Sequence, residues 1–176
     1  MIPEAIGMRH SRRMILAPPL LSCLKPRVRA VVQRVVEARV TVGDEEVGAI
    51  GHGLCVLLGV AATDTEADAD RLCQKIVGLR VFADGNSEFA RSVEDVGGGL
   101  LIVSQFTLHG DCRKGRRPSF GAAAPAARAQ SLYERFVTTA RQGNVPVATG
   151  RFQAHMAVAL VNDGPVTLLL DTAEAG

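Results

Sequence analysis

The most informative run in this chain is Leu54-Cys55-Val56-Leu57-Leu58-Gly59-Val60, which is apolar at every position. A strand with one face in water alternates apolar and polar side chains, whereas a strand covered on both faces is apolar throughout. Gly51-His52-Gly53 precedes the run and punctuates the chain there. We therefore expect a central strand with packed layers on both of its faces.

Further strands and two helices are predicted around this run. Helical spacing of apolar residues is found in 67–79 and again from Pro125 to about Gln142, where Pro125 suits a first helical position. The other segments that read as strands are 29–35, 38–42, 47–50, 100–108, 145–148, 156–161 and 166–170. This pattern predicts a single α/β domain of mixed β-sheets with a layer of two helices, in a three-layer β/β/α arrangement.

The composition is ordinary for a globular protein, with 47% hydrophobic and 22% charged residues among 176, and it is too polar for a membrane span. The cysteines lack the C-x-x-C spacing of a metal site, and a disulfide framework is not expected at this length. They are Cys23, Cys55, Cys73 and Cys112. We therefore expect a reducing, cytoplasmic location and neither a metal ion nor another cofactor.

Residues 1–27 differ from the rest of the chain, since their net charge is +4 whereas that of the remaining residues is −2, which together give the total of +2. Arg9 to Arg13 and the apolar residues that follow faintly resemble a signal peptide, but prolines interrupt the apolar part and Lys25-Pro26-Arg27 replaces a small-residue cleavage site. We interpret 1–27 as a disordered tail or a mis-assigned start, 28–172 as the domain and 173–176 as a C-terminal tail. A working signal peptide is the alternative.

Polar side chains end the apolar run 100–103, in the sequence Ser104-Gln105-Phe106-Thr107. Its hydroxyls and amide could fix a substrate, and successive backbone N–H groups at a strand end could hold an oxyanion. Thr107 needs an activating base if it is to be a nucleophile. The histidines are scattered, at His10, His52, His109 and His155. The sequence contains no nucleophile elbow, H-E-x-x-H motif or P-loop.

Four cations follow within five positions, at Arg113, Lys114, Arg116 and Arg117. Arginine pairs bidentately with phosphate oxygens, so this basic loop is a candidate phosphate contact. A solvated surface loop explains the same cluster equally well. Few aromatic residues and the lack of an RNP-like or zinc-finger pattern argue against base-specific recognition of a nucleic acid.

A polar stretch, Asn162-Asp163-Gly164-Pro165-Val166-Thr167, separates the apolar runs 156–161 and 166–170. Glycine accepts backbone angles that other residues avoid, and proline fixes φ and removes a donor, so the stretch predicts a hairpin turn. A cis peptide is tolerated at a Gly-Pro bond, although such bonds are usually trans. Local chemistry alone therefore favours a simple connector.

Two motifs in this order resemble a known family. They are Ser104-Gln105-Phe106-Thr107-Leu108 and the Asn162 to Thr167 stretch, with Arg116-Arg117-Pro118-Ser119-Phe120 and Thr149-Gly150-Arg151-Phe152 between them. Together they resemble the D-aminoacyl-tRNA deacylases, formerly described as D-tyrosyl-tRNA deacylases, which proofread chirality. The resemblance runs from about Val28 to Thr172.

The resemblance implies a cytoplasmic homodimer that hydrolyses the ester between a D-amino acid and the terminal ribose of tRNA, or between glycine and tRNA(Ala). It implies that Gly164 and Pro165, joined by a cis peptide, enter the other subunit's active site and exclude an L side chain through their backbone carbonyls. Ser104, Gln105, Phe106 and Thr107 would be the catalytic residues, with N–H groups near Phe106 and Thr107 placed for the oxyanion. The basic loop would meet tRNA phosphates, and neither DNA nor a membrane is an expected partner.

The family offers two mechanisms. Either the threonine hydroxyl is the nucleophile, or the ribose 2′-OH of the substrate helps to activate water while the protein only positions. We favour the second, because the sequence gives Thr107 no obvious base. The chain departs from the family at Glu88-Phe89-Ala90, where Lys-Met-Asn is usual, and at Cys112, where threonine is common.

Two other functions stay open at the level of sequence. A related branch of deacylases removes certain L-amino acids from wrong tRNAs and has a trans Gly-Pro bond. A non-catalytic RNA-binding module would use only the basic loop. Deacylation of D-Tyr-tRNA and L-Tyr-tRNA, measured side by side, separates all three hypotheses.

Overall fold

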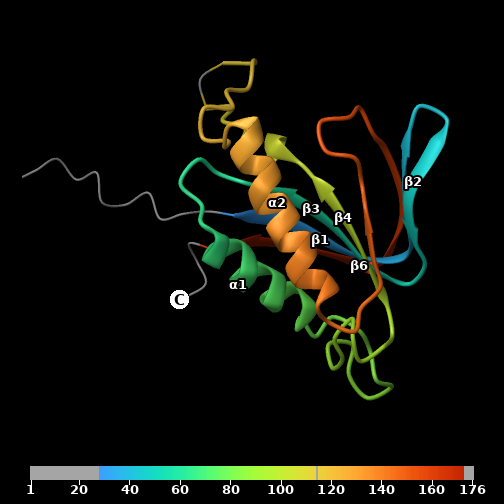
Figure 1. Cartoon of the computed structure of the whole chain (residues 1–176). Helices are drawn as coiled ribbons and strands as arrows, with labels where there is room; N and C mark the ends of the chain where they lie inside the picture. The colour runs from blue at the N-terminus through green and yellow to red at the C-terminus, as the bar shows by residue number, and fades with distance from the viewer. Residues whose placement is uncertain (1–27, 114, 173–176) are drawn as a thin grey trace, which may run out of the picture.

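The computed structural model describes residues 28–113 and 115–172, which form one six-stranded sheet and two helices of three or more turns (Figure 1). The elements are β1 (Arg29–Val42), β2 (Glu45–Ile50), β3 (Gly53–Gly59), α1 (Glu66–Val77), β4 (Gly99–Ser104), the 3₁₀ helix η1 (Phe106–His109), α2 (Ala126–Arg141), β5 (Val147–Thr149) and β6 (Ala157–Asp171). The strand order is β2-β1-β3-β4-β5, and β6 pairs with the other edge of β1. β3, β4 and β5 are parallel, and the remaining pairs are antiparallel.

The central strand β3 is covered on both faces, as its apolar sequence predicted. Leu54, Val56 and Leu58 face the helices and join a core cluster that includes Phe136 of α2. Cys55 faces the other way, into a second cluster with Leu101 and Val103 of β4 and with residues of β1. Burial raises the pKa of Cys55 to about 11, so this thiol is a small core side chain and not a nucleophile.

The second β layer arises because the same sheet folds over itself. β2 packs against β4 and β5, and the approach is so close that a Cβ on Gly48 would lie 2.5 Å from the backbone oxygen of Thr149. Glycine is required at such a contact because any side chain would collide with backbone. The predicted fold class is confirmed, with the difference that one continuous hydrogen-bonded sheet supplies both β layers.

Both helices lie where the apolar spacing predicted them, within two residues at each end. α1 begins with a capping box, in which the Thr65 hydroxyl accepts from the N–H of Asp68 (3.3 Å) and the Asp68 carboxylate accepts from the N–H of Thr65 (3.0 Å). α2 begins directly after Pro125. Among the described residues no helix has the length and hydropathy that a membrane crossing requires.

The predicted hairpin turn at Asn162–Thr167 is wrong, because both flanking runs belong to the single strand β6. The runs 29–35 and 38–42 likewise form one strand, β1, and β6 pairs with it from Arg29↔Asp171 to Thr41↔Ala157. The larger of two breaks in the register of this strand pair lies between Gln33 and Val35. Gln33 pairs with Thr167 and Val35 with Asn162, so Arg34 alone stands opposite residues 163–166. The polar stretch is therefore a bulge within a long antiparallel pair.

One smaller expectation also changes. Residues 106–108, expected at the end of a strand, form η1, since the chain leaves the sheet after Ser104. The predicted tails 1–27 and 173–176 lie outside the described residues, so their interpretation stays a prediction.

Candidate active site

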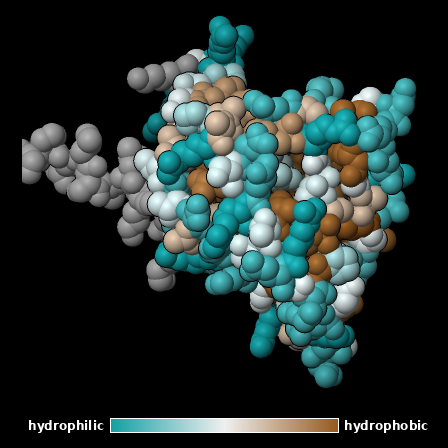
Figure 2. Space-filling model, in the orientation of Figure 1, coloured by the Kyte–Doolittle hydropathy of each residue, from teal (hydrophilic) through white to brown (hydrophobic). Residues whose placement is uncertain are grey.

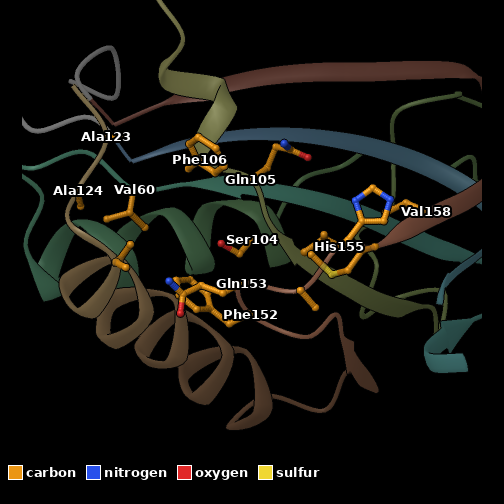
Figure 3. A pocket seen from close by; sticks show the side chains of 15 residues that line it. Val60, Ser104, Gln105, Phe106, Ala123, Ala124, Phe152, Gln153, His155 and Val158 are labelled. Atoms are coloured by element: carbon orange, nitrogen blue, oxygen red, sulfur yellow. The ribbon is translucent and has the colours of Figure 1, made fainter. Parts of the chain in front are cut away.

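A cavity of about 540 Å³ opens where β4 ends, and we call it the β4 cavity (Figure 3). One wall is the end of β4 and the start of η1, another is the first turn of α2, and the third is the segment between β5 and β6. Its lining residues are Val60, Val103, Ser104, Gln105, Phe106, Ala123, Ala124, Ala126, Ala129, Phe152, Gln153, Ala154, His155, Met156 and Val158. The size and the mostly apolar lining suit a small organic ligand.

The walls of the β4 cavity are tied to the core by two hydrogen bonds. The Tyr133 hydroxyl of α2 donates to the carbonyl of Ile102 in β4 (2.9 Å), and the N–H of Gln105 donates to the carbonyl of Leu58 (2.7 Å). Burial raises the pKa of Tyr133 to about 12, which keeps its hydroxyl a donor at physiological pH. The Tyr133 ring also lies 5.9 Å from that of Phe152. Helix, strand and loop therefore hold the cavity in one shape.

The predicted catalytic residues are brought together here, although not all of them line the cavity. Ser104 and Gln105 are half-buried in its wall, and Phe106 is 55% exposed with its ring 5.0 Å from the ring of Phe120. Thr107 is exposed and lies outside the lining set. Its hydroxyl contacts the side-chain amide of Gln105.

This arrangement of residues is suited to positioning a substrate. Among the described residues, the hydrogen-bond partner of the Thr107 hydroxyl is the Gln105 amide, which is not a base. The first N–H groups of η1, those of Phe106 and Thr107, have no acceptor within the helix and none elsewhere among the described residues, so they can donate to a ligand. The described residues contain no cluster of three His, Cys, Asp or Glu side chains that could hold a metal ion.

Sequence reasoning assigned no site role to the third wall, Phe152 to Met156, although Phe152 ends one of the quoted family motifs. This segment lies between β5 and β6 and carries Gln153 at φ 61°, an uncommon angle for a residue other than glycine. His155, which the sequence suggested to be an ordinary surface or core histidine, is exposed and points along the cavity wall near Val158 (Figure 3). The available signal was a long irregular connection in a compact domain, which often carries function.

The bulge on β6 lies outside the β4 cavity. The Gly164–Pro165 peptide is cis, and both residues are exposed. The Arg34 guanidinium lies beneath them, with Nε 3.0 Å from Asp163 Oδ2 and Nη1 donating to the carbonyl of Val81 (2.5 Å).

The side chain of Asn162 closes the bulge from within. Its Nδ2 donates to the carbonyls of Arg34 (2.9 Å) and Val166 (3.0 Å), which are the two sides of the register break. Gly164 has φ 115°, and a Cβ there would lie 2.9 Å from Arg34 Nη2. The bulge is therefore a fixed structure that only glycine fits at its tip.

Exposed apolar side chains surround the bulge on β1 and β6. Val36, Val161 and Leu169 are 52%, 50% and 82% exposed. On the face seen in Figure 2, more hydrophobic surface is gathered beside helix α2. Monomeric proteins seldom leave several large apolar side chains exposed along one strand pair, so this surface is suited to a protein partner.

The predicted basic loop follows η1 and is solvent-exposed at Arg113, Arg116 and Arg117. Lys114 lies outside the described residues. Arg113 pairs with Asp111, at 2.9 Å from Nε and 2.6 Å from Nη2, and this pairing lowers the pKa of Asp111 to about 2. The loop does not line the β4 cavity.

Comparisons with known proteins fit these features. A model of the family described as D-Tyr-tRNA(Tyr) deacylase matches residues 31–171. D-aminoacyl-tRNA deacylases from Desulforudis audaxviator and Thermotoga petrophila are 61% and 54% identical, over 82% and 84% of this chain and 97% and 99% of those proteins. A solved structure of the c-Myc DNA Unwinding Element Binding Protein is 43% identical with a TM-score of 0.77, and covers 81% of this chain and 97% of its own.

A second solved structure bears on the fold alone. The structure of a probable eukaryotic D-amino acid tRNA deacylase superposes with a TM-score of 0.72 at 19% identity, over 82% of this chain and 99% of its own.

Proposed function

The chain belongs to the D-Tyr-tRNA(Tyr) deacylase family, and on this premise we propose that it hydrolyses the ester between a D-amino acid and the 3′-terminal ribose of tRNA. Membership makes it a hydrolase that acts on the ester bond of D-aminoacyl-tRNA, an activity that serves proofreading in translation. The single observation that supports the site is the β4 cavity, a preformed apolar space with Ser104 and Gln105 in its wall.

The proposed mechanism is one in which the protein positions and the substrate assists. A water oxygen bonds to the ester carbonyl carbon, the C–O bond to the ribose breaks, and the ribose oxygen leaves with a proton. The ribose 2′-OH helps to activate the water. The N–H groups of Phe106 and Thr107 donate to the oxygen that gains charge. This assignment is supported by the lack of a base at the Thr107 hydroxyl among the described residues.

We assign the rejection of L-amino acids to Gly164 and Pro165. Because both are exposed and outside their own chain's β4 cavity, they reach a substrate only if a second copy presents them. The exposed side chains of Val36, Val161 and Leu169 beside the bulge supply a surface for that second copy, in a homodimer with two-fold symmetry. Backbone carbonyls held by the Arg34 and Asn162 contacts would then bind the substrate's amino group and leave no room for an L side chain.

The finer substrate range and the tRNA contacts are part of the same proposal. A filter made from backbone carbonyls accepts glycine, which has no side chain, so glycine on tRNA(Ala) is a second substrate. The exposed cations Arg113, Arg116 and Arg117, with Lys114 between them in sequence, would meet phosphates of the acceptor stem in the cytoplasm.

The decisive test is single-turnover deacylation of D-Tyr-tRNA and L-Tyr-tRNA by the purified protein. We expect the D ester to be cleaved at least about 100-fold faster, because a rigid filter excludes the L side chain sterically. Equal cleavage of both esters would indicate the branch that accepts L-amino acids. Binding of tRNA without cleavage of either ester would indicate an RNA-binding module.

A pair of variants ties this activity to the β4 cavity. Ala129→Phe fills the cavity from α2, whereas Ala127→Phe adds the same ring at an exposed position of α2 that does not line it. We expect the first to abolish cleavage of D-Tyr-tRNA and the second to leave it unchanged. If the two variants behave alike, the β4 cavity is not the active site.

A further inference from the structure

A second cavity, of about 590 Å³, lies beside the β4 cavity, and we call it the His109 cavity. Small residues form much of its lining, among them Ala61, Ala62 and Ala122. Its polar and charged side chains are those of Arg29, Thr63, His109, Asp111 and Arg113, and the Asp111 carboxylate is engaged by Arg113. A space of this size is large enough for a nucleotide, and the smooth walls of alanine leave room for a flat or bulky group.

The two cavities are neighbours across a single pair of residues. Ala61 forms an isolated bridge with Ala123, with Val60 and Ala124 on the side of the β4 cavity and Ala62 and Ala122 on the side of the His109 cavity. The helix η1 also joins them, because Phe106 lines one and His109 the other. Three residues of 3₁₀ helix rise about 6 Å, a distance that one nucleotide of a single strand spans.

The cations of the His109 cavity keep donors for a ligand. Arg29 donates from Nε to Asp171 (3.1 Å) and from Nη1 to the carbonyl of Leu108 (3.1 Å), and no hydrogen bond to another described residue occupies its Nη2. Arg113 is paired with Asp111, but the arginine side chain is 88% exposed and the aspartate 40%. An exposed pair of this kind is weak, so a phosphate can compete for the guanidinium.

His109 is the strongest indication of a ligand. It is only 4% exposed, lines the cavity, and its Nε2 is buried with no hydrogen-bond partner among the described residues. Burial lowers the pKa of His109 and outweighs a backbone hydrogen bond with Gly59, which raises it, so the imidazole is neutral at physiological pH. A buried nitrogen without a partner is destabilising and calls for an explanation. A ribose hydroxyl, which both donates and accepts, satisfies this nitrogen in either tautomer.

We propose that the His109 cavity is a subsite for the nucleotide that precedes the aminoacylated adenosine of the substrate tRNA. Arg29 and Arg113 bind its phosphate and His109 Nε2 bonds its ribose, while the alanines of the lining lie against the base. The inference rests on the proposed function, because it needs the terminal adenosine in the β4 cavity. It adds that the enzyme reads the single-stranded end of tRNA over two nucleotides.

The test compares two small substrates, D-tyrosyl-adenosine and the D-tyrosyl ester of cytidylyl-adenosine (CpA). We expect kcat/KM to be about tenfold or more higher for the CpA ester, since one charge-assisted hydrogen bond contributes about that factor. Ala62→Leu, which fills the His109 cavity from an exposed position, is expected to abolish the advantage and leave cleavage of D-tyrosyl-adenosine unchanged. Ala67→Leu, at an exposed position of α1, is the matched control.

His109→Phe gives an independent readout, because it keeps a buried ring and removes the unpartnered nitrogen. We expect the CpA advantage to fall several-fold in a protein that still unfolds cooperatively, with any decrease in Tm reporting the lost hydrogen bond with Gly59. Equal kcat/KM for the two esters in the wild-type protein, or an advantage that survives in Ala62→Leu, overturns the subsite and leaves the proposed function standing. If neither ester is cleaved, the proposed function fails and the subsite fails with it.

Discussion

The β4 cavity and the bulge at 162–167 differ in their exposure and in the contacts that hold them in place. The cavity is walled by buried strand ends and an irregular loop that the hydrophobic core holds in place. The bulge is exposed on the long β1–β6 pair, and the buried side chain of Arg34 and the half-buried side chain of Asn162 fix it through hydrogen bonds and one ion pair. The β4 cavity offers room for a ligand but no feature that selects between enantiomers. The bulge offers a rigid, exposed surface but no room for a ligand.

This difference explains why neither region is sufficient for stereoselective hydrolysis. In a single chain the exposed residues Gly164 and Pro165 do not line the β4 cavity. If the two regions act on one substrate, the bulge of one subunit meets the cavity of the other. The comparison therefore predicts a dependence of activity on pairing between subunits, which can be tested without knowledge of the interface.

The largest expected effect is in a subunit-mixing experiment with Ala129→Phe, which blocks the cavity, and Gly164→Ala, which alters the bulge. Each variant alone is expected to be inactive on D-Tyr-tRNA. Unfolding and refolding an equal mixture should restore about a quarter of wild-type activity, because half of the dimers are mixed and each has one intact site. Inactivity of the mixture, with mixed dimers shown to be present, would place cavity and bulge in the same subunit.

The next effect in size concerns the tip of the bulge. Gly164→Ala puts a Cβ 2.9 Å from Arg34 Nη2 at φ 115°, so we expect about 2–4 kcal/mol of lost stability and a large loss of activity. Gly43→Ala is the control, since Gly43 also has positive φ, 59°, but nothing lies within 4 Å. It should cost about 1 kcal/mol and leave deacylation unchanged. Urea unfolding and D-Tyr-tRNA cleavage measure both quantities.

The two regions also differ in how far the sequence reveals them. Local signals placed the apolar strands, the helices and the polar end of β4, because periodicity and capping residues report burial directly. The bulge was predicted as a hairpin turn because Asn162-Asp163-Gly164-Pro165 has turn chemistry. What decides its structure is pairing with β1, more than 120 residues away in sequence, and local propensity carries no information on such a partner.

The sequence predicted only part of the lining of the β4 cavity, for a related reason. Ser104 and Gln105 were identified because they end an apolar run, whereas Phe152 and His155 lie in a connection without periodicity. Their role depends on where α2 and β6 place that connection. The family motifs predict a functional role for the bulge although its local pattern does not, because they compare whole proteins and not single segments.

A smaller effect is expected at Thr107. Its substitution tests whether this residue beside the β4 cavity acts as a nucleophile or only helps to position the substrate. Because the hydroxyl contacts an amide and no base, Thr107→Ala should lower kcat by about tenfold or less. Thr107→Ser should be close to the wild type. Single-turnover cleavage of D-Tyr-tRNA measures both. A loss of about a thousandfold or more in a folded dimer would instead identify the hydroxyl as the nucleophile.

The smallest effect is expected at a site that belongs to neither region, the ion pair between α1 and α2. Arg135 and Thr139 donate to Asp70 and lower the pKa of this carboxyl from 3.8 to about 2. A group whose pKa is depressed in the folded state stabilises above its unfolded pKa, and the contribution disappears as pH falls from about 4 to 2. Because this pair faces solvent, Asp70→Asn should cost at most about 1 kcal/mol at pH 7.

The same variant is the reference against which effects at the cavity and the bulge are judged. The difference in Tm between Asp70→Asn and the wild type should shrink as pH is lowered and vanish near pH 2, whereas D-Tyr-tRNA cleavage at pH 7 should be equal in the two proteins. Arg135→Gln removes the other partner and should reproduce both results. A loss of activity in Asp70→Asn would mean that catalysis responds to the general stability of the protein. The effects of Ala129→Phe and Gly164→Ala could then not be assigned to the cavity and the bulge themselves.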